Sequence, residues 1–150
     1  MSTISVSRII AAPADKIWGM VSDLPRMGEW SPENRGGSWI KGATGAAKGA
    51  RFKGNNAHGK KSWSTDATVS ECVAGKEFGF RVTVGPIKVA HWHYLIEDLG
   101  DGTCKVTEST TDNRPKLIRM LGKAASGVED REGFNKTSME QTLEAIAKAV

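Results

Sequence analysis

The most informative segment of the chain runs from Val6 to Trp39, VSRIIAAPADKIWGMVSDLPRMGEWSPENRGGSW. Its first residues, up to Ile10, predict a strand, which is interrupted at Ala12-Pro13. Proline suits the first position of a helix, because the N–H that it lacks would have no partner there. Asp15 adds a negative charge to the first turn, where the helix dipole favours it. A short helix is therefore predicted to follow the strand.

A second short helix is predicted to begin at Pro25 and to end at Pro32, and two tryptophans, Trp30 and Trp39, accompany it. A strand, two short helices and large aromatic side chains together form a framework that closes one end of a sheet over something apolar. The strands of that sheet are expected further along the chain.

Six further strands are predicted from alternation of apolar and polar residues. Alternation that leaves one face apolar is typical of an antiparallel sheet with one solvated side. Short polar connections favour hairpins between neighbours in sequence. With the opening strand, seven strands are expected. The six are Ser38–Gly42, Ala50–Asn56, Ser62–Val73, Glu77–Val84, Lys88–Asp98 and Thr103–Asp112.

The same alternation predicts the register, because a slip by one residue would move every apolar side chain to the wrong face. The expected cross-strand pairs are Val73 with Lys76, Val69 with Phe80, Ala67 with Val82, Asn56 with Trp63, Phe52 with Ala67, Ile96 with Val106, Tyr94 with Glu108, and Trp92 with Thr110. After Arg114-Pro115 the apolar spacing becomes helical. Glycines predict a break near Ser126-Gly127, before a long C-terminal helix.

Length and composition indicate a soluble globular protein in which residues 1–150 form a single domain. The chain has 39% hydrophobic and 25% charged residues, which is ordinary for such a domain. It contains no apolar run long enough for a transmembrane segment and no secretory signal pattern, so we expect a cytoplasmic protein. Cys72 and Cys104 lie far apart, without a zinc-binding motif, and are expected to be reduced.

The net charge of +4 is concentrated in one segment, since Arg35 to Lys61 contains seven basic residues and no acidic one. Alternation turns Phe52 inward while Arg51 and Lys53 point outward. Such lysines protect an edge hairpin against pairing with another sheet edge. Two alternatives are attraction of an anionic ligand and weak contact with an anionic membrane surface, whereas nucleic-acid binding is disfavoured.

Several segments along the whole chain carry a family resemblance. They are APADKIW (12–18), SDL (22–24), Trp30, GARFKG (49–54), Trp63 and VTES (106–109). This pattern resembles the SRPBCC superfamily, the START-like or Bet v 1-like helix-grip group, and within it the polyketide cyclase/dehydrase-type branch. The resemblance implies an α+β fold, with a curved seven-stranded antiparallel sheet around the C-terminal helix and a cavity between them. Members bind lipids, polyketides, sterols or plant hormones, and some catalyse cyclisation or dehydration.

The predicted inward faces supply the candidate ligand-binding residues. Large apolar side chains with a few polar groups suit a mostly apolar ligand whose orientation is set by those polar groups. Asn56 and Glu108 are the expected polar groups. The alternative is that the aromatic side chains simply fill a core. The candidates are Met27, Trp30, Phe52, Asn56, Trp63, Phe80, Trp92, Tyr94, Glu108, Met120 and Phe134, with Ile96 and Leu121 beside them.

The first functional hypothesis is a binding or carrier protein for a small hydrophobic molecule, such as a lipid, a polyketide or an aromatic metabolite. The alternative is a cyclase, aromatase or dehydratase that works without a cofactor, in which Glu108 or Tyr94 moves protons. A third is a regulator whose ligand closes the loop at Gly85-Pro86. No GxSxG, GxGxxG or P-loop motif is present, so neither an activated serine nor a nucleotide cofactor is expected.

No metal site is expected either. His91 and His93 share one face of a strand, but it is the face opposite Trp92 and Tyr94, and no nearby carboxylate is evident. Two ligands do not make a site, so both are interpreted as solvated surface histidines. The oligomeric state is left open between monomer and homodimer.

Overall fold

The computed structural model describes residues 2–128 and 130–150. Within them the strands form one seven-stranded antiparallel sheet with the order β1-β7-β6-β5-β4-β3-β2. Each strand except β1 therefore lies beside a neighbour in sequence, and β1 pairs with the last strand. The strands are β1 (Ser2–Ile10), β2 (Asn34–Ile40), β3 (Arg51–His58), β4 (Lys61–Val73), β5 (Glu77–Val84), β6 (Ile87–Asp98) and β7 (Cys104–Asp112).

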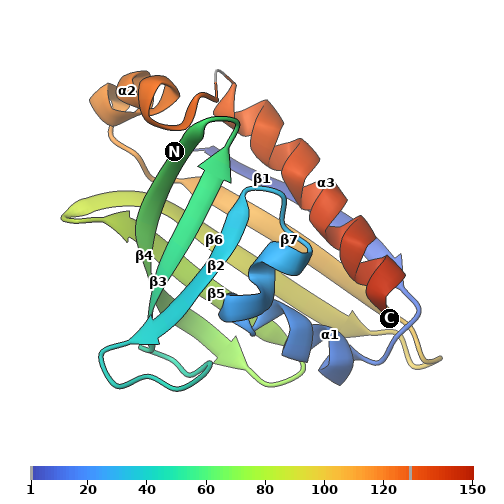
Figure 1. Ribbon diagram of the computed structural model, residues 1–150. Coiled ribbons are helices and arrows are strands. Elements are labelled where there is room, and N and C mark those ends of the chain that lie inside the picture. Colours follow the sequence, from blue (N-terminus) through green and yellow to red (C-terminus); the bar gives the residue numbers. More distant parts are fainter. Residues whose placement is uncertain (1, 129) are drawn as a thin grey trace.

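The helices are α1 (Ala14–Val21), the 3₁₀ helix η1 (Leu24–Glu29), α2 (Lys116–Ser126) and α3 (Arg131–Ala149). Figure 1 shows α3 lying along the curved sheet, with α1 and η1 near its C-terminal end and α2 near its N-terminal end. This arrangement confirms the predicted α+β helix-grip fold. No helix in the described part of the chain is both long enough and apolar enough to span a membrane.

The boundaries in the opening stretch differ slightly from the prediction. Pro13 is the N-cap of α1 rather than its first residue, because its ψ of 149° is extended although its φ of −68° suits a helix. The second helix ends at Glu29, before Pro32. Strand β2 begins at Asn34, earlier than expected, and its pairing with β3 is irregular between Asn34 and Gly37. That irregularity breaks the alternation, which is why the sequence pattern missed the first half of the strand.

The predicted register is confirmed across the sheet. Phe52 pairs with Ala67, and Tyr94 pairs with Glu108. The exception is Val73, which pairs with Glu77 rather than Lys76. The remaining confirmed pairs are Val69 with Phe80, Ala67 with Val82, Asn56 with Trp63, Ile96 with Val106, and Trp92 with Thr110. The β4–β5 register shifts between Val69 and Glu71, and a bulge of this kind adds one residue to one strand only.

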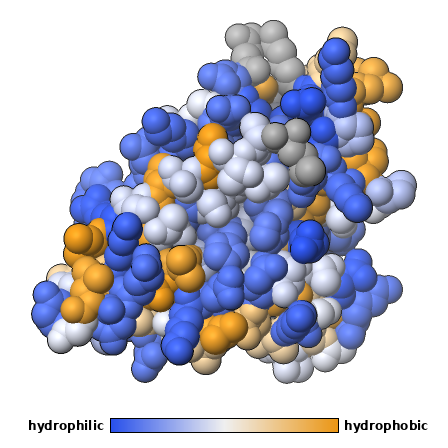
Figure 2. Space-filling view, turned by 180° about the vertical axis from the view of Figure 1, so that it is seen from behind, coloured by the Kyte–Doolittle hydropathy of each residue, from blue (hydrophilic) through white to orange (hydrophobic). Residues whose placement is uncertain are grey.

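The two faces of the sheet differ in polarity. From behind, the molecule shows mostly polar and charged side chains with scattered apolar ones (Figure 2). Hydroxyl pairs join β1 to β7 there, Thr3 with Thr111 at 2.8 Å and Ser7 with Thr107 at 2.9 Å. The face toward α3 carries the hydrophobic core.

The core is concentrated around α1 and the C-terminal half of α3. Phe78, Ile17 and Ile146 are completely buried there. Trp18 packs edge-on against Phe78, with ring centroids 6.5 Å apart, and its indole N–H donates to the carbonyl of Glu77. At the other end of α3 the sheet and the helix do not meet, and a cavity lies between them.

Candidate ligand-binding cavity

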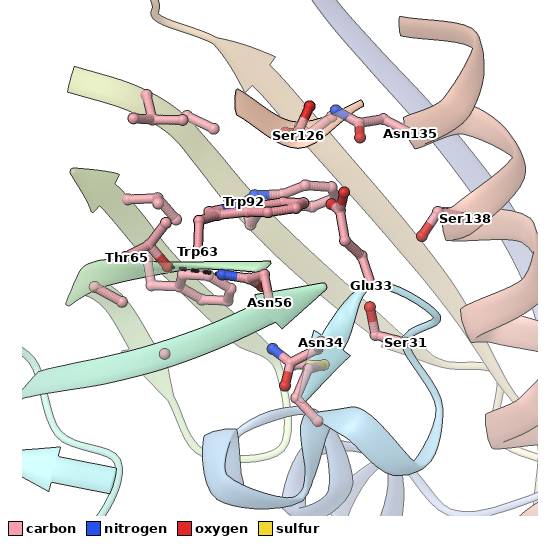
Figure 3. A pocket seen from close by; sticks show the side chains of 18 of the residues that line it. Ser31, Glu33, Asn34, Asn56, Trp63, Thr65, Trp92, Ser126, Asn135 and Ser138 are labelled. Atoms are coloured by element: carbon pink, nitrogen blue, oxygen red, sulfur yellow. Dashed lines mark hydrogen bonds between the residues drawn. The ribbon is translucent and has the colours of Figure 1, made fainter. Parts of the chain in front are cut away.

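The cavity has a volume of about 340 Å³ and extends between the inner face of β3 to β7 and the N-terminal half of α3. That volume lies within the range of small-molecule sites. Leu24 and Met27 of η1 line one end, and Ala125 and Ser126 of α2 line the other. Figure 3 shows Trp63 and Trp92 in the middle, between polar side chains of α3 and those of the segment before β2.

Most of the predicted site residues lie in the cavity wall, and the alternation of the strands explains why they meet. The cross-strand pair Asn56 and Trp63 lies on one side, and Trp92 with its partner Thr110 on another. Contact of these side chains with a ligand remains a prediction. The predicted residues in the wall are Met27, Phe52, Asn56, Trp63, Phe80, Trp92, Tyr94 and Glu108.

Three other predicted residues lie outside the wall, in contrast to the prediction. Trp30 is buried beside η1, where the guanidinium of Arg26 lies 5.2 Å from its ring centre. Phe134 packs against the ring of His58, 4.9 Å away. Met120 is 70% exposed on α2, and Leu121 is also exposed. Helical spacing predicts an apolar face but does not say which way that face turns, so sequence reasoning placed Met120 and Leu121 inward although both are exposed.

Glu108 and Tyr94 form a polar floor in the cavity. Both are buried, and the Tyr94 hydroxyl donates to Met27 Sδ at 3.9 Å. Burial raises the pKa of Glu108 to about 8, and the Tyr94 hydroxyl opposes that rise only in part. Burial and the negative charge of Glu108 raise the pKa of Tyr94 well above its usual value. Near neutral pH both groups are therefore mostly protonated and able to donate a hydrogen bond.

Thr110 lies beside Glu108 and extends this floor, and two polar atoms of the floor are available to a ligand. Oε1 of Glu108 and Oγ1 of Thr110 are buried without a hydrogen-bond partner among the described residues. Buried polar atoms in proteins are rarely left unpaired, so such a pair in a cavity wall indicates a place for a bound group. Sequence reasoning missed Thr110 as a site residue, although its place two residues after Glu108 on β7 puts both on the same face.

An ion pair joins the segment before β2 to the first turn of α3. Nη1 of Arg131 donates to both carboxylate oxygens of Glu33, at 2.8 and 3.0 Å. The Arg131 guanidinium also lies 6.0 Å from the centre of the Trp63 ring. Both charged residues line the cavity. Sequence reasoning missed this pair, because the partners lie far apart along the chain and no local pattern connects them.

Neutral polar groups occupy the rest of the wall. The Asn56 amide donates to Thr65 Oγ1 at 3.2 Å. Figure 3 shows Asn135 and Ser138 extending from α3 toward the space beside the two tryptophans. A second ion pair, between Arg114 and Asp112 at 2.8 Å, lies at the α2 end. Aromatic rings therefore make the middle of the cavity apolar, and the two ends are more polar than the sequence predicted.

His91 and His93 lie on the outer face, as predicted, but they are not simply solvated. His91 Nε2 lies 2.7 Å from a carboxylate oxygen of Glu71, and His93 Nε2 lies 2.6 Å from one of Glu77. The expectation that no carboxylate is near was wrong, because the bulge in β4 and the pairing of β5 bring these glutamates across the strands. No cluster of three or more metal-ligating side chains occurs in residues 2–128 and 130–150.

Comparison with known proteins places the chain in a family. The sequence model described as "Polyketide cyclase / dehydrase and lipid transport" matches residues 1–150. The chain belongs to this family. A Polyketide_cyc-like protein of Corynebacterium glutamicum has a similar solved structure, with 33% identity, 98% of this chain and 90% of that chain covered, and a TM-score of 0.61. A search of curated proteins finds no match.

More distant structures share the fold alone. A protein of Chromobacterium violaceum is 12% identical, with a TM-score of 0.74 and coverage of 100% of this chain and 98% of that one. The di-domain ARO/CYC protein BexL, from the BE-7585A biosynthetic pathway, is also 12% identical, with a TM-score of 0.68; the match covers 97% of this chain and 46% of BexL. Family membership supports a ligand-binding or cyclase role in general terms.

Proposed function

We propose that this protein binds a small, mostly apolar molecule, such as a lipid, a polyketide or an aromatic metabolite, in the cavity between the sheet and α3. The observation that carries the proposal is a space of about 340 Å³ walled by aromatic rings, with unpartnered polar atoms in its floor. Removing apolar surface from water provides the driving force, at about 25 cal/mol per Å².

The floor also limits the chemistry of the buried end of the ligand. A protonated Glu108 can donate to a carbonyl oxygen or exchange hydrogen bonds with a hydroxyl group, and Thr110 can do the same. A ligand carboxylate at this position is disfavoured, because it would place a second acidic group beside Glu108 in a buried site. The preferred ligand therefore carries a neutral oxygen at its inner end.

The experiment is a thermal-unfolding series with matched probes, such as 2-naphthol, 1-tetralone and the hydrocarbon naphthalene. A ligand that binds only the folded state stabilises it by about 2.7 kcal/mol at one hundred times its Kd. We expect the two oxygenated probes to raise the Tm more than naphthalene does. Native mass spectrometry of protein purified from its own host would weigh whatever co-purifies. No shift with any apolar probe, and no co-purified mass, would contradict the proposal.

The protonation of Glu108 favours a second candidate, a cyclase or dehydratase that needs no cofactor. A carboxyl group with a raised pKa is suited to general acid catalysis near neutral pH. In a dehydration, Glu108 would protonate a leaving hydroxyl, which departs as water, and its carboxylate would take the proton lost from the neighbouring carbon. The wall would hold a flexible substrate in the reactive shape.

The substitution Glu108→Gln separates the two candidates. It keeps the size and the neutral hydrogen bonding of the protonated side chain but cannot transfer a proton. If the protein is a catalyst, turnover of a poly-β-ketone substrate is lost while probe binding survives. Glu97→Gln, the same change at an exposed glutamate of β6 outside the cavity wall, is the matched control. Equal turnover in the wild type and Glu108→Gln would remove Glu108 from the chemistry.

A further inference from the structure

Helix α2 presents its apolar stripe to solvent. Leu117, Met120 and Leu121 are 64%, 70% and 57% exposed, and their spacing puts them on one face of the helix. Ile118, on the other side, is half-buried. A surface helix ordinarily turns its apolar stripe to the core, so an outward stripe of large side chains indicates an interaction surface.

The surroundings of this stripe are basic. Lys116 and Arg119 lie exposed on the same helix, and the sequence from 116 to 128 contains no acidic residue. The β3–β4 hairpin lies beside the end of α2, since the position of a Cβ on Gly127 is 3.4 Å from Lys61 Cγ and 3.8 Å from the His58 ring. Figure 1 shows α2 and this hairpin at the same end of the molecule, and in Figure 2 apolar side chains stand beside hydrophilic ones at the upper right, over α2.

We propose that α2 and the β3–β4 hairpin form a docking surface for an anionic lipid bilayer. In this arrangement Leu117, Met120 and Leu121 enter the headgroup region. Lys116 and Arg119 of α2, with Lys60 and Lys61 of the hairpin, meet the lipid phosphates. An amphipathic helix with apolar residues on one face and Lys or Arg at its flanks binds in this way. A second copy of the chain fits less well, because a twofold axis would set the same basic groups against each other.

The position of α2 connects this surface to the cavity. Ala125 and Ser126, from the last turn of the same helix, line the cavity, and so does Val84, which is partly exposed to solvent. The α2 end is therefore the mouth of the cavity. Docking would place that mouth against the bilayer, so that an apolar ligand could pass between the lipid and the cavity without crossing water. This consequence rests on the proposed function; the docking itself does not.

The test is co-sedimentation of the whole protein with phosphatidylcholine vesicles, with and without phosphatidylserine, in the absence of any cavity ligand. We expect binding to the vesicles that contain phosphatidylserine, weakened by salt. The triple variant Leu117→Gln, Met120→Gln, Leu121→Gln should bind at least tenfold more weakly, and so should Lys116→Glu with Arg119→Glu. Ile9→Gln is the matched control, since Ile9 is an equally exposed apolar residue on β1.

The result that overturns the proposal is a wild-type protein that fails to sediment with either vesicle, or a triple variant that binds as well as the wild type. Analytical ultracentrifugation supplies a second readout. A dimer that the triple variant abolishes, without vesicle binding, would assign this face to a second copy and overturn the bilayer. Because the assay contains no ligand, its failure leaves the thermal-shift result for the cavity unaffected.

Discussion

The two halves of α3 differ in what they face. In the C-terminal half, Leu143 and Ile146 are buried as part of the hydrophobic core between α3 and the sheet. In the N-terminal half, Arg131, Asn135 and Ser138 face the cavity. The same helix therefore contributes to folding stability at one end and to a binding space at the other. The core beyond the cavity holds the helix in place, and the cavity persists for that reason.

The largest effect is expected when one aromatic ring is truncated on each side of the boundary between core and cavity. Phe78 and Phe80 are close on β5, with ring centroids 5.9 Å apart, but Phe78 is completely buried while Phe80 lines the cavity. We expect Phe78→Ala to lower the free energy of unfolding by about 3–5 kcal/mol. Phe80→Ala should cost less than about 2 kcal/mol. If urea denaturation shows that both variants lose the same free energy of unfolding, the cavity end is packed as tightly as the core.

The pH dependence of stability should arise at the cavity end. The pKa of Glu108 is about 8 in the folded protein, against an ordinary value of 4.5. Between pH 4.5 and about pH 8, the folded state keeps a proton that the unfolded state has lost. The stability that Glu108 contributes is therefore fully present below pH 4.5 and is lost as the pH rises through about 8. The expected loss is about 1 kcal/mol for each pH unit.

Urea denaturation at about pH 5 and about pH 8 measures this effect, with the slope defined by linkage. In Glu108→Gln the decline due to this group disappears, because glutamine does not titrate. A wild type and a variant with parallel pH profiles would show that the floor of the cavity holds no titrating carboxyl group.

The ion pair between Glu33 and Arg131 tests how the cavity end of α3 is held. We expect a coupling energy of about 1 kcal/mol in a double-mutant cycle with Glu33→Gln and Arg131→Met. The pair is partly screened by solvent, which keeps the value small. Amide hydrogen exchange should become faster in the first turn of α3 and stay unchanged around Ile146. If the exchange rate instead increases by the same factor along the whole of α3, the two ends of the helix open as one cooperative unit.

The smallest expected effect has the opposite sign. Thr110→Val removes a buried hydroxyl that has no partner among the described residues. Valine has nearly the same shape, so the protein should become more stable by about 0.5–1 kcal/mol, while the affinity for oxygenated probes falls. A loss of stability would show that the hydroxyl already has a role in the folded protein.

Much of the cavity wall could be predicted, because the residues involved lie on strands. Side chains alternate strictly in a strand, so the pairing of Tyr94 with Glu108 and of Asn56 with Trp63 follows from the apolar pattern alone. Helices carry less information of this kind. The apolar stripe of α2 was recognised, but its direction was not, and Met120 was assigned to the cavity although it is exposed.

The order of the elements, the antiparallel pairing and the inner face of the sheet follow from the sequence, since these depend on local periodicity and on turns between neighbours. Other features arise from the packing of distant elements: Glu33 meets Arg131, glutamates face His91 and His93, and α2 turns its leucines outward. Those outcomes depend on how elements far apart in the chain are placed against one another, and no local pattern records that placement.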